Sequence, residues 1–452
     1  MVKSVCIIGG GISGLCTAFR LTKQGVDVTL FEKGERVGGN IRSEFADGFL
    51  IEHGPNSLLV TPQLVELIEE LGLFDEIDNA NSSARTRFVL REGKLAALPT
   101  RFIDIFSNRP ISVSGKLRAL REPFIRTRST PNESVSEFFA RRFGREVVDY
   151  AVDPFVSGIF AGEPDRLSIK NAFPRLFELE RDYGSVIKGF LQAPKNKSGT
   201  KAEGLTRTIS FKGGLQTLIE RLAAELGASV RLGCAIEHIR RTADGMFEVQ
   251  GDGGFEIFDS VVDCTPAYNA AELLEPMDTA FSDRLASVEY PPISVVYTGF
   301  KKSDVRFDMD GFGFLVPGLE KRKILGSLWT SSVFAGRAPE GHHLMTTFIG
   351  GARNPELAKR SEDELIEIAV GEIGEVLGLQ GEPVFTRVKK WERAIPQYNI
   401  GYENVVSAID NFQQQNPGLF LCSNFYGGIS VGDCVKNSLS TTRTVLEFIE
   451  ND

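Results

Sequence analysis

Residues 5–32, VCIIGGGISGLCTAFRLTKQGVDVTLFE, decide the fold of the chain. The stretch opens with an apolar run over 5–8, which is followed by Gly9, Gly11 and Gly14 and then by apolar residues at helical spacing. A second apolar run over 26–31 ends at Glu32. This order predicts a buried strand, a glycine-rich turn, a helix and a second parallel strand. The spacing is typical of a dinucleotide-binding βαβ unit.

Each residue of the motif has a physical role. Gly9 permits the tight turn, Gly11 lets the backbone approach a pyrophosphate, and Gly14 lets the helix pack close to the strand. The free N–H groups at the helix N-terminus then attract phosphate. Glu32 is placed to bind a ribose hydroxyl, and its charge would repel the 2′-phosphate of NADP. The alternative is a glycine-rich turn without a ligand, but the strand, helix and acid together favour a nucleotide.

A second glycine pair separates FAD from NAD. Gly38 and Gly39 follow shortly after Glu32, within residues 36–43 (RVGGNIRS). A second glycine pair lets the chain pass close to the dinucleotide again, which is typical of FAD enzymes and has no use in an NAD dehydrogenase. The cofactor predicted from these residues is FAD.

The bulk properties exclude several other classes. The chain has 452 residues, enough for two or three domains, and its net charge of −9 argues against nucleic acid as a partner. Its six cysteines form no C-x-x-C pair, and its four histidines are too dispersed for a metal triad or a Ser-His-Asp arrangement. The first predicted strand starts almost at the N-terminus and no apolar run approaches ~18 residues, so we expect a cytoplasmic protein without a spanning helix.

The remaining pattern indicates further elements. We expect a helix over 61–78, a hairpin over 87–98, and helices over 134–143 and 147–155. Strands over 229–232, 236–239, 246–250, 255–258 and 260–264 return to the nucleotide domain, and strands over 293–300, 313–316, 324–329 and 344–350 form a second domain. A glycine-rich turn over 427–432 precedes a helix over 434–449 and can aim its N-terminus at a flavin.

Residues 101–128 differ from the rest of this acidic chain. They contain seven Lys and Arg against two Asp and Glu, interleaved with apolar residues. Such a basic amphipathic segment can lie on an anionic membrane surface. A solvated helix face and a basic funnel for an anionic substrate are the alternatives.

Several blocks carry a family resemblance. GGGISGL at 9–15 and RVGGN at 36–40 are typical of the flavin amine oxidase superfamily. Narrower matches are GPNS at 54–57, DPFVSGIFAG at 153–162, FKGGLQTL at 211–218, GFGFLVP at 311–317, IPQY at 395–398 and GISVGDC at 428–434. On these blocks, which span the chain in order, the sequence resembles the oxygen-dependent protoporphyrinogen oxidases of that superfamily.

The resemblance implies an α/β and α+β architecture with three parts. It implies a discontinuous Rossmann-like FAD-binding domain over 1–88, 206–265 and 386–452. It also implies a helical membrane-associated lobe over 89–205 and a mixed-sheet substrate-binding domain over 266–385.

The resemblance also implies site residues. The residues expected to bind FAD are Gly9, Gly10, Gly11, Ile12, Ser13, Gly14, Glu32, Lys33, Gly39, Asn40, Gly54, Pro55, Asn56, Ser57, Ile236, Trp391, Ile429, Ser430 and Val431. The residues expected to line the substrate pocket are Arg87, Asn56, Ala161, Leu315, Leu328 and Phe348. Ala161 departs from the glycine of many relatives, which would tighten the pocket. By spacing alone, Arg87 reads as a solvated hairpin residue, and Leu315, Leu328, Phe348 and Trp391 read as core.

The implied activity is oxidation of protoporphyrinogen IX by six electrons to protoporphyrin IX, with O2 as acceptor and H2O2 as product. No catalytic side chain and no metal site are expected. Coproporphyrinogen III is the alternative substrate, and a second cation at the pocket mouth would favour it. An amine oxidase, a carotenoid desaturase and a non-catalytic protein that binds prenylated GTPases are further alternatives. Candidate partners are a peripheral membrane surface on the inner face of the cell membrane, a second copy of the chain and a downstream ferrochelatase.

Overall fold

The computed structural model describes residues 3–98, 111–193, 205–251 and 253–451. Its nucleotide-binding part is built on a five-stranded parallel sheet with the strand order β10-β2-β1-β14-β20. These strands are β1 (Ser4–Ile8), β2 (Asp27–Phe31), β10 (Val230–Arg231), β14 (Ser260–Asp263) and β20 (Leu419–Leu421). The two central strands are almost wholly buried, which explains their continuous apolar runs.

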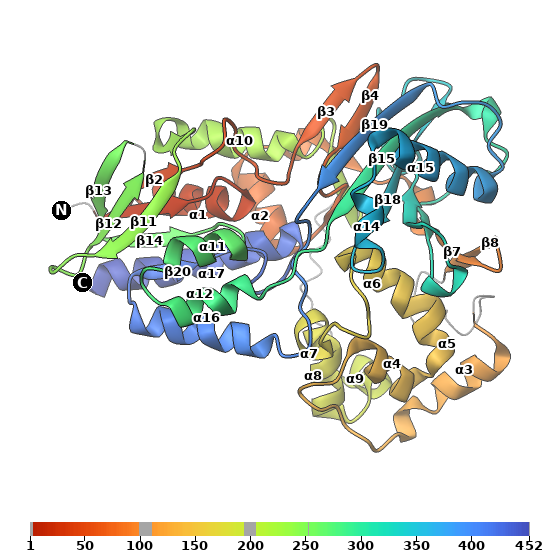
Figure 1. The fold of residues 1–452 in the computed structure, drawn as a ribbon, viewed down its shortest axis with the longest axis horizontal. Coiled ribbons are helices and arrows are strands. Elements are labelled where there is room, and N and C mark those ends of the chain that lie inside the picture. Colours follow the sequence, from red (N-terminus) through yellow and green to blue (C-terminus); the bar gives the residue numbers. More distant parts are fainter. Residues whose placement is uncertain (1–2, 99–110, 194–204, 252, 452) are drawn as a thin grey trace.

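Both faces of this sheet are covered, as Figure 1 shows. One face packs against α1 (Ile12–Lys23), α2 (Pro62–Glu70), α10 (Gln216–Leu226) and α17 (Val431–Asn451). The other face packs against the three-stranded sheet β11 (Ile236–Arg241), β12 (Phe247–Gly251) and β13 (Gly254–Phe258), and against α11 (Ala267–Leu274), α12 (Thr279–Ala286) and α16 (Glu403–Gln415). The segments of this part come from both ends and the middle of the chain, so it is discontinuous.

A seven-stranded mixed sheet forms the second part, with the order β19-β15-β18-β17-β16-β7-β8. Its strands are β7 (Arg87–Arg91), β8 (Lys94–Leu98), β15 (Ile293–Lys301), β16 (Gly313–Leu315), β17 (Ile324–Leu328), β18 (His342–Gly350) and β19 (Phe385–Trp391). All neighbours are antiparallel except β7 and β16. Helix α15 (Glu362–Leu377) packs on one face, and the short helices α13 (Thr330–Val333) and α14 (Pro355–Ala358) pack beside β18. Because β7, β8 and β19 join this sheet, it crosses the domain boundaries expected near residues 88 and 386.

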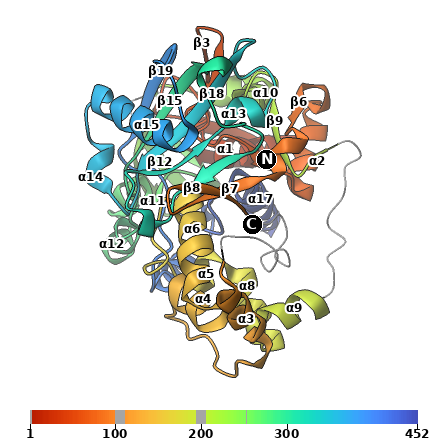
Figure 2. The ribbon, with the colours of Figure 1, turned by 90° about the vertical axis from the view of Figure 1, so that its right-hand side faces the viewer.

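The third part is a helical lobe, seen below the sheets in Figures 1 and 2. It contains α3 (Val113–Leu120), α4 (Val135–Phe143), α5 (Arg145–Val147), α6 (Asp153–Phe160), α7 (Ile169–Ala172), α8 (Pro174–Tyr183) and α9 (Val186–Gln192). A buried ion cluster joins its helices, since Arg142 contacts both Glu122 and Glu180. Buried charges persist only when they are paired in this way.

Two short sheets connect the parts. The hairpin β3 (Ser43–Ala46) and β4 (Phe49–Glu52) precedes a small sheet of β5 (Leu58–Leu59), β9 (Thr208–Phe211) and β6 (Ile77–Asn79). Arg337 donates to Glu52 Oε1 at 2.9 Å and to Ser210 Oγ at 2.5 Å, so it ties β4 to β9. Both charged side chains are buried.

Two expectations for helices were wrong in detail. The helix expected over 61–78 ends at Glu70, because Gly72 turns the chain with φ +65° before β6 begins at Ile77. The helix expected over 147–155 contains a π-helical segment, Val148–Val152, before α6 begins at Asp153. The hairpin over 87–98 is confirmed, with its turn at Glu92 and Gly93. The basic segment over 101–128 lies partly outside the described residues.

Candidate functional site

The glycine loop lies at the carboxyl end of β1 and leads into α1. Gly9 has φ +102°, and a Cβ on it would lie 3.2 Å from the carbonyl carbon of Cys264. A Cβ on Gly14 would lie 2.0 Å from the Gly9 carbonyl oxygen, so only glycine fits this helix against its loop. Gly11 caps α1 without a side-chain hydrogen bond, and a Cβ there would meet no atom within 4 Å. The N-terminus of α1 is therefore open to a phosphate.

Glu32 lies beside this loop at the end of β2. Its Oε2 accepts from the Gly10 N–H and its Oε1 from the Gly34 N–H, both at 2.8 Å. The carboxylate is thereby fixed next to the glycine turn, as a ribose-binding acid requires. The backbone oxygen of Glu32 also accepts from the Cys234 N–H at 3.0 Å, which places the approach to Ile236 on β11 against the same edge. Lys33, the next residue, is exposed.

The second glycine pair closes over the first loop. The Gly38 N–H donates to the Gly10 carbonyl oxygen at 2.7 Å, and a Cβ on Gly39 would lie 3.3 Å from the Gly11 Cα. A Cβ on Gly54 would lie 2.0 Å from the Asn40 carbonyl oxygen, so residues 54–57 pack on the same group. The structure thus brings together three segments that the sequence separates.

Trp391 and the C-terminal turn complete this group. The Trp391 Nε1–H donates to the His53 carbonyl oxygen at 2.9 Å, beside residues 54–57. A Cβ built on Gly432, in the first turn of α17, would lie 3.3 Å from the Thr61 side chain. Ser430 and Asp433 cap α17 through reciprocal hydrogen bonds. Since α1 and α17 pack in one core, their N-termini both lie in the nucleotide-binding part.

These residues fit FAD. The space in front of Gly11 is free of protein atoms, because a Cβ built on this residue would have no neighbour within 4 Å. Asn56 Oδ1 is buried and lacks a hydrogen-bond partner in the described part of the chain, as expected of a group that binds a ligand. With Glu32 for the ribose and two helix N-termini nearby, the donors and acceptors match a dinucleotide.

The expected substrate residues share one face of the seven-stranded sheet. Leu315 on β16 pairs with Gly326 on β17, which pairs with Phe348 on β18, so the three form one row across the strands. Leu328 lies two residues beyond Gly326 and therefore on the same face. Leu315, Leu328 and Phe348 are half-buried in otherwise buried runs, which leaves their apolar surfaces partly open.

Arg87 and Ala161 border this apolar row. Val89 pairs with Leu315, and Arg87 lies two residues earlier on the same strand face. The Arg87 guanidinium stacks on the Phe312 ring at 4.8 Å. Ala161 ends α6 with φ +49°, and Gly158 on α6 lies against the Leu315 side chain. Asn56 belongs to the segment 54–57, which packs on the glycine loops rather than on the seven-stranded sheet.

Two features escaped the sequence reasoning. Arg87 is exposed, as its place in the hairpin predicts, but the protein atoms around its guanidinium lower its pKa by desolvation, and the nearby charge of Arg207 lowers it further. Arg207 precedes β9 and is remote from Arg87 in sequence, so no local motif could reveal it. Gln397 and Tyr398 belong to a quoted motif, but only the fold shows that their side chains reach the backbone of other parts.

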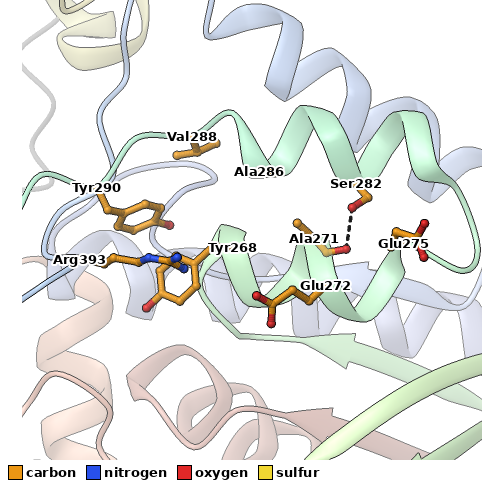
Figure 3. A pocket seen from close by; sticks show the side chains of 9 residues that line it. All are labelled: Tyr268, Ala271, Glu272, Glu275, Ser282, Ala286, Val288, Tyr290 and Arg393. Atoms are coloured by element: carbon orange, nitrogen blue, oxygen red, sulfur yellow. Dashed lines mark hydrogen bonds between the residues drawn. The ribbon is translucent and has the colours of Figure 1, made fainter.

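A separate cavity lies away from this site. A hollow of about 420 Å³ lies between α11, α12 and the segment after β19. Figure 3 shows its lining residues, among them Tyr268, Tyr290, Glu272 and Arg393. The Arg393 guanidinium stacks on the Tyr268 ring at 4.4 Å. None of the expected site residues lines this cavity. We therefore place the candidate site at the glycine loops and the apolar sheet face.

Comparisons with known proteins agree with this geometry. The family model described as "Flavin containing amine oxidoreductase" matches residues 12–446. The chain is 35% identical to protoporphyrinogen oxidase 2, chloroplastic/mitochondrial, of Arabidopsis thaliana, over 99% of this chain and 95% of that protein. It is 29% identical to coproporphyrinogen III oxidase of Bacillus subtilis, over 99% of this chain and 98% of that protein.

Solved structures show the same fold. A crystal structure from Exiguobacterium sp. 255-15, which carries a provisional protoporphyrinogen oxidase name, superposes with a TM-score of 0.81 at 25% identity, covering 99% of both chains. Reduced UDP-galactopyranose mutase superposes with a TM-score of 0.73 at 17% identity, covering 100% of this chain and 96% of that one, which shows the fold alone.

The chain belongs to the flavin containing amine oxidoreductase family. It is an FAD-dependent oxidoreductase, and the predicted cofactor and fold class are confirmed. In the described ranges, no helix is long and apolar enough to cross a membrane. Within those ranges, no three His, Cys, Asp or Glu side chains gather as a metal-binding group.

Proposed function

We propose that this protein oxidises a porphyrinogen to a porphyrin in haem biosynthesis, with protoporphyrinogen IX as substrate. The observation that carries the proposal is the apolar row of Leu315 and Phe348, joined by Leu328, with Arg87 at its border. A large flat apolar ring with propionate groups needs such a surface. The names of the relatives, which include protoporphyrinogen and coproporphyrinogen III oxidases, support the same substrate class.

The side chains divide the work of binding. Leu315, Leu328 and Phe348 remove apolar ring surface from water, at roughly 25 cal/mol per Å². Gly326 carries no side chain between Leu315 and Phe348, and a Cβ built on it would lie 3.2 Å from Leu315 Cδ2, so Leu315 leans over the glycine. The Arg87 fork binds both oxygens of one propionate, which orients the ring.

Bound FAD would supply the redox chemistry, namely acceptance of hydride equivalents from the carbon bridges of the substrate and transfer of the electrons to O2, which gives H2O2. Three such two-electron steps account for six electrons. Beside the three hydride equivalents, two pyrrole nitrogens and, after imine–enamine tautomerisation, the fourth carbon bridge each release one proton to water, so no side-chain base is required. The residues of the two glycine loops hold the cofactor: Gly9–Gly14, Glu32, Lys33, Gly39, Asn40 and Gly54–Ser57, with Ile236, Trp391 and Ile429–Val431 from the other segments.

Coproporphyrinogen III is the second candidate substrate. The charge of Arg207 lowers the pKa of Arg87, so the two guanidinium groups lie near each other. A substrate with more propionates would use a second cation, which makes coproporphyrinogen III the alternative that the comparison of the two substrates tests. An amine oxidase is disfavoured, because Phe425 is fully buried and the Tyr426 hydroxyl donates to Asp410, so the two rings do not flank a common space. The glycine loops and Glu32 argue against a non-catalytic GTPase-binding protein.

Turnover of the two porphyrinogens tests the proposal. The FAD-loaded protein is given each substrate in air, while porphyrin fluorescence and O2 consumption are followed together. We expect fluorescence and O2 uptake with protoporphyrinogen IX, and a lower kcat/KM with coproporphyrinogen III. Arg87→Lys keeps the charge but loses the fork, and Arg87→Leu loses both, so KM should rise in that order. Absence of O2 uptake with either substrate would refute the proposal.

We also propose peripheral contact with the inner face of the cell membrane. Val113, Leu117, Leu120 and Phe124 of the helical lobe are 52–82% exposed, and Leu191 of α9 is 73% exposed. Exposed apolar residues of this size favour an interface. The protein should sediment with anionic vesicles, and Phe124→Glu should reduce the bound fraction. A homodimer and a downstream ferrochelatase remain proposed partners, which cross-linking of the purified proteins would test.

A further inference from the structure

Residues 395–398 (IPQY) join three parts of the molecule. The segment follows β19 and leads to α16, so it connects the seven-stranded sheet with the nucleotide-binding part. The Gln397 N–H donates to the Glu289 carbonyl oxygen at 2.9 Å, which pairs this connection with the one that enters β15. The Ser168 N–H donates to the Tyr398 carbonyl oxygen at 2.8 Å, which adds the helical lobe.

The Gln397 side chain fixes the end of α6. Its Nε2 donates to the Phe160 carbonyl oxygen at 2.7 Å and to the Ile395 carbonyl oxygen at 3.0 Å. Phe160 is the last residue of α6, and Ala161 follows with φ +49°. A Cβ on Gly162 would lie 2.4 Å from Gln397 Oε1, so the amide is wedged against this turn. Gln397 is 3% exposed, so its amide makes these contacts away from solvent.

The Tyr398 side chain fixes the C-terminal glycine turn. Its hydroxyl donates to the Asn424 carbonyl oxygen at 2.7 Å and accepts from the Gly428 N–H at 3.1 Å. The turn includes Gly427 and Gly428 with φ +88° and +127°, conformations that a free chain holds only weakly. The neighbouring Tyr402 ring packs at 4.5 Å, and its hydroxyl donates to the Phe425 carbonyl oxygen at 2.6 Å.

We propose that Gln397 and Tyr398 are positioning residues that set the flavin-facing turn 424–431 against the substrate-facing end of α6. The two are consecutive, so one short segment fixes the end of α6 through Gln397 and the turn 424–431 through Tyr398. The inference rests on the proposed function, because that function makes 429–431 a cofactor contact and Ala161 a substrate contact. Neither side chain touches the reacting atoms in this account.

Tyr398→Phe tests the flavin side without a porphyrinogen. The variant keeps the ring and loses both hydrogen bonds of the hydroxyl. We expect the apoprotein to bind FAD about tenfold more weakly and the bound flavin to show an altered absorption spectrum. Tyr290→Phe is the matched control, because its hydroxyl accepts from the Ala267 N–H and contacts no atom of the turn. Unchanged FAD affinity and spectrum in Tyr398→Phe would overturn the proposal. This readout needs no substrate, so it stands whether or not the protein turns over a porphyrinogen.

Gln397→Met tests the substrate side. The variant keeps the volume and removes the donors to Phe160, so KM should rise about tenfold while FAD affinity and spectrum stay as in the unchanged protein. If the role of Gln397 were purely structural, Gln397→Met would lower the free energy of unfolding but leave the KM and the FAD affinity of the folded fraction unchanged. Urea unfolding of each apoprotein separates these cases. Tyr402→Phe provides a second flavin-side variant if Tyr398→Phe does not fold, and normal FAD binding in it would count against the proposal.

Discussion

Replacing Gly11 and Gly14 separately by alanine distinguishes the cofactor cradle from the packing of the loop. An added Cβ at Gly11 meets nothing within 4 Å, and its φ of −71° suits alanine. The apoprotein of Gly11→Ala should therefore unfold within about 0.5 kcal/mol of the unchanged protein. An added Cβ at Gly14 lies 2.0 Å from the Gly9 carbonyl oxygen, so Gly14→Ala should lose about 1–3 kcal/mol through overpacking.

FAD affinity should fall clearly in Gly11→Ala, although the stability of its apoprotein barely changes. A methyl group in front of α1 displaces one charge-assisted hydrogen bond to a phosphate, worth about 1.5–3 kcal/mol, which is roughly a ten- to hundredfold weaker Kd. The assay titrates apoprotein with FAD by flavin fluorescence, beside urea unfolding of the same samples. Normal FAD affinity in Gly11→Ala would refute the placement of the pyrophosphate at this helix.

Four further changes test other parts of the account. Glu32→Gln should weaken FAD about tenfold in the same titration, since a charged ribose acceptor is lost. Arg337→Met should lower the urea-measured free energy of unfolding by about 3–5 kcal/mol, because it leaves the buried Glu52 carboxylate unpaired, whereas Arg337→Met with Glu52→Gln should lose less. Burial raises the pKa of Asp263, at the end of β14, from 3.8 to about 6. The folded protein therefore binds the Asp263 proton more tightly than the unfolded chain does. The resulting contribution to the free energy of unfolding is fully present below pH 3.8 and is lost as the pH rises through about 6. Asp263→Asn should remove that slope from the pH dependence of unfolding.

The nucleotide-binding part was predictable because its signals are local. The strand, the three glycines and Glu32 lie within 28 consecutive residues, and each has a steric or electrostatic role that the structure displays in the contacts of Gly9 and Gly14. The apolar face of the second sheet was different. Leu315 and Phe348 read as ordinary core by spacing, and only the resemblance singled them out. The register that aligns them across β16, β17 and β18 depends on long-range pairing, which no local pattern encodes.

Other features were beyond a local reading for the same reason. Arg207 acts on Arg87 through space, across more than a hundred residues of chain. The hydrogen bonds of Gln397 and Tyr398 join segments that meet only in the folded protein. The helix expected over 61–78 failed because the apolar pattern continues past Gly72, where the backbone turns. Periodicity alone does not report a left-handed residue inside an apolar run.

The central claim is that a porphyrinogen is oxidised directly by the flavin of this protein. Anaerobic mixing of the FAD-loaded protein with one equivalent of protoporphyrinogen IX, followed by flavin absorbance, tests it most directly. We expect the absorbance of oxidised flavin to disappear on mixing and to return when O2 is admitted. Arg87→Leu should slow the loss at low substrate concentration. Oxidised flavin that persists through anaerobic mixing with both protoporphyrinogen IX and coproporphyrinogen III would contradict the claim.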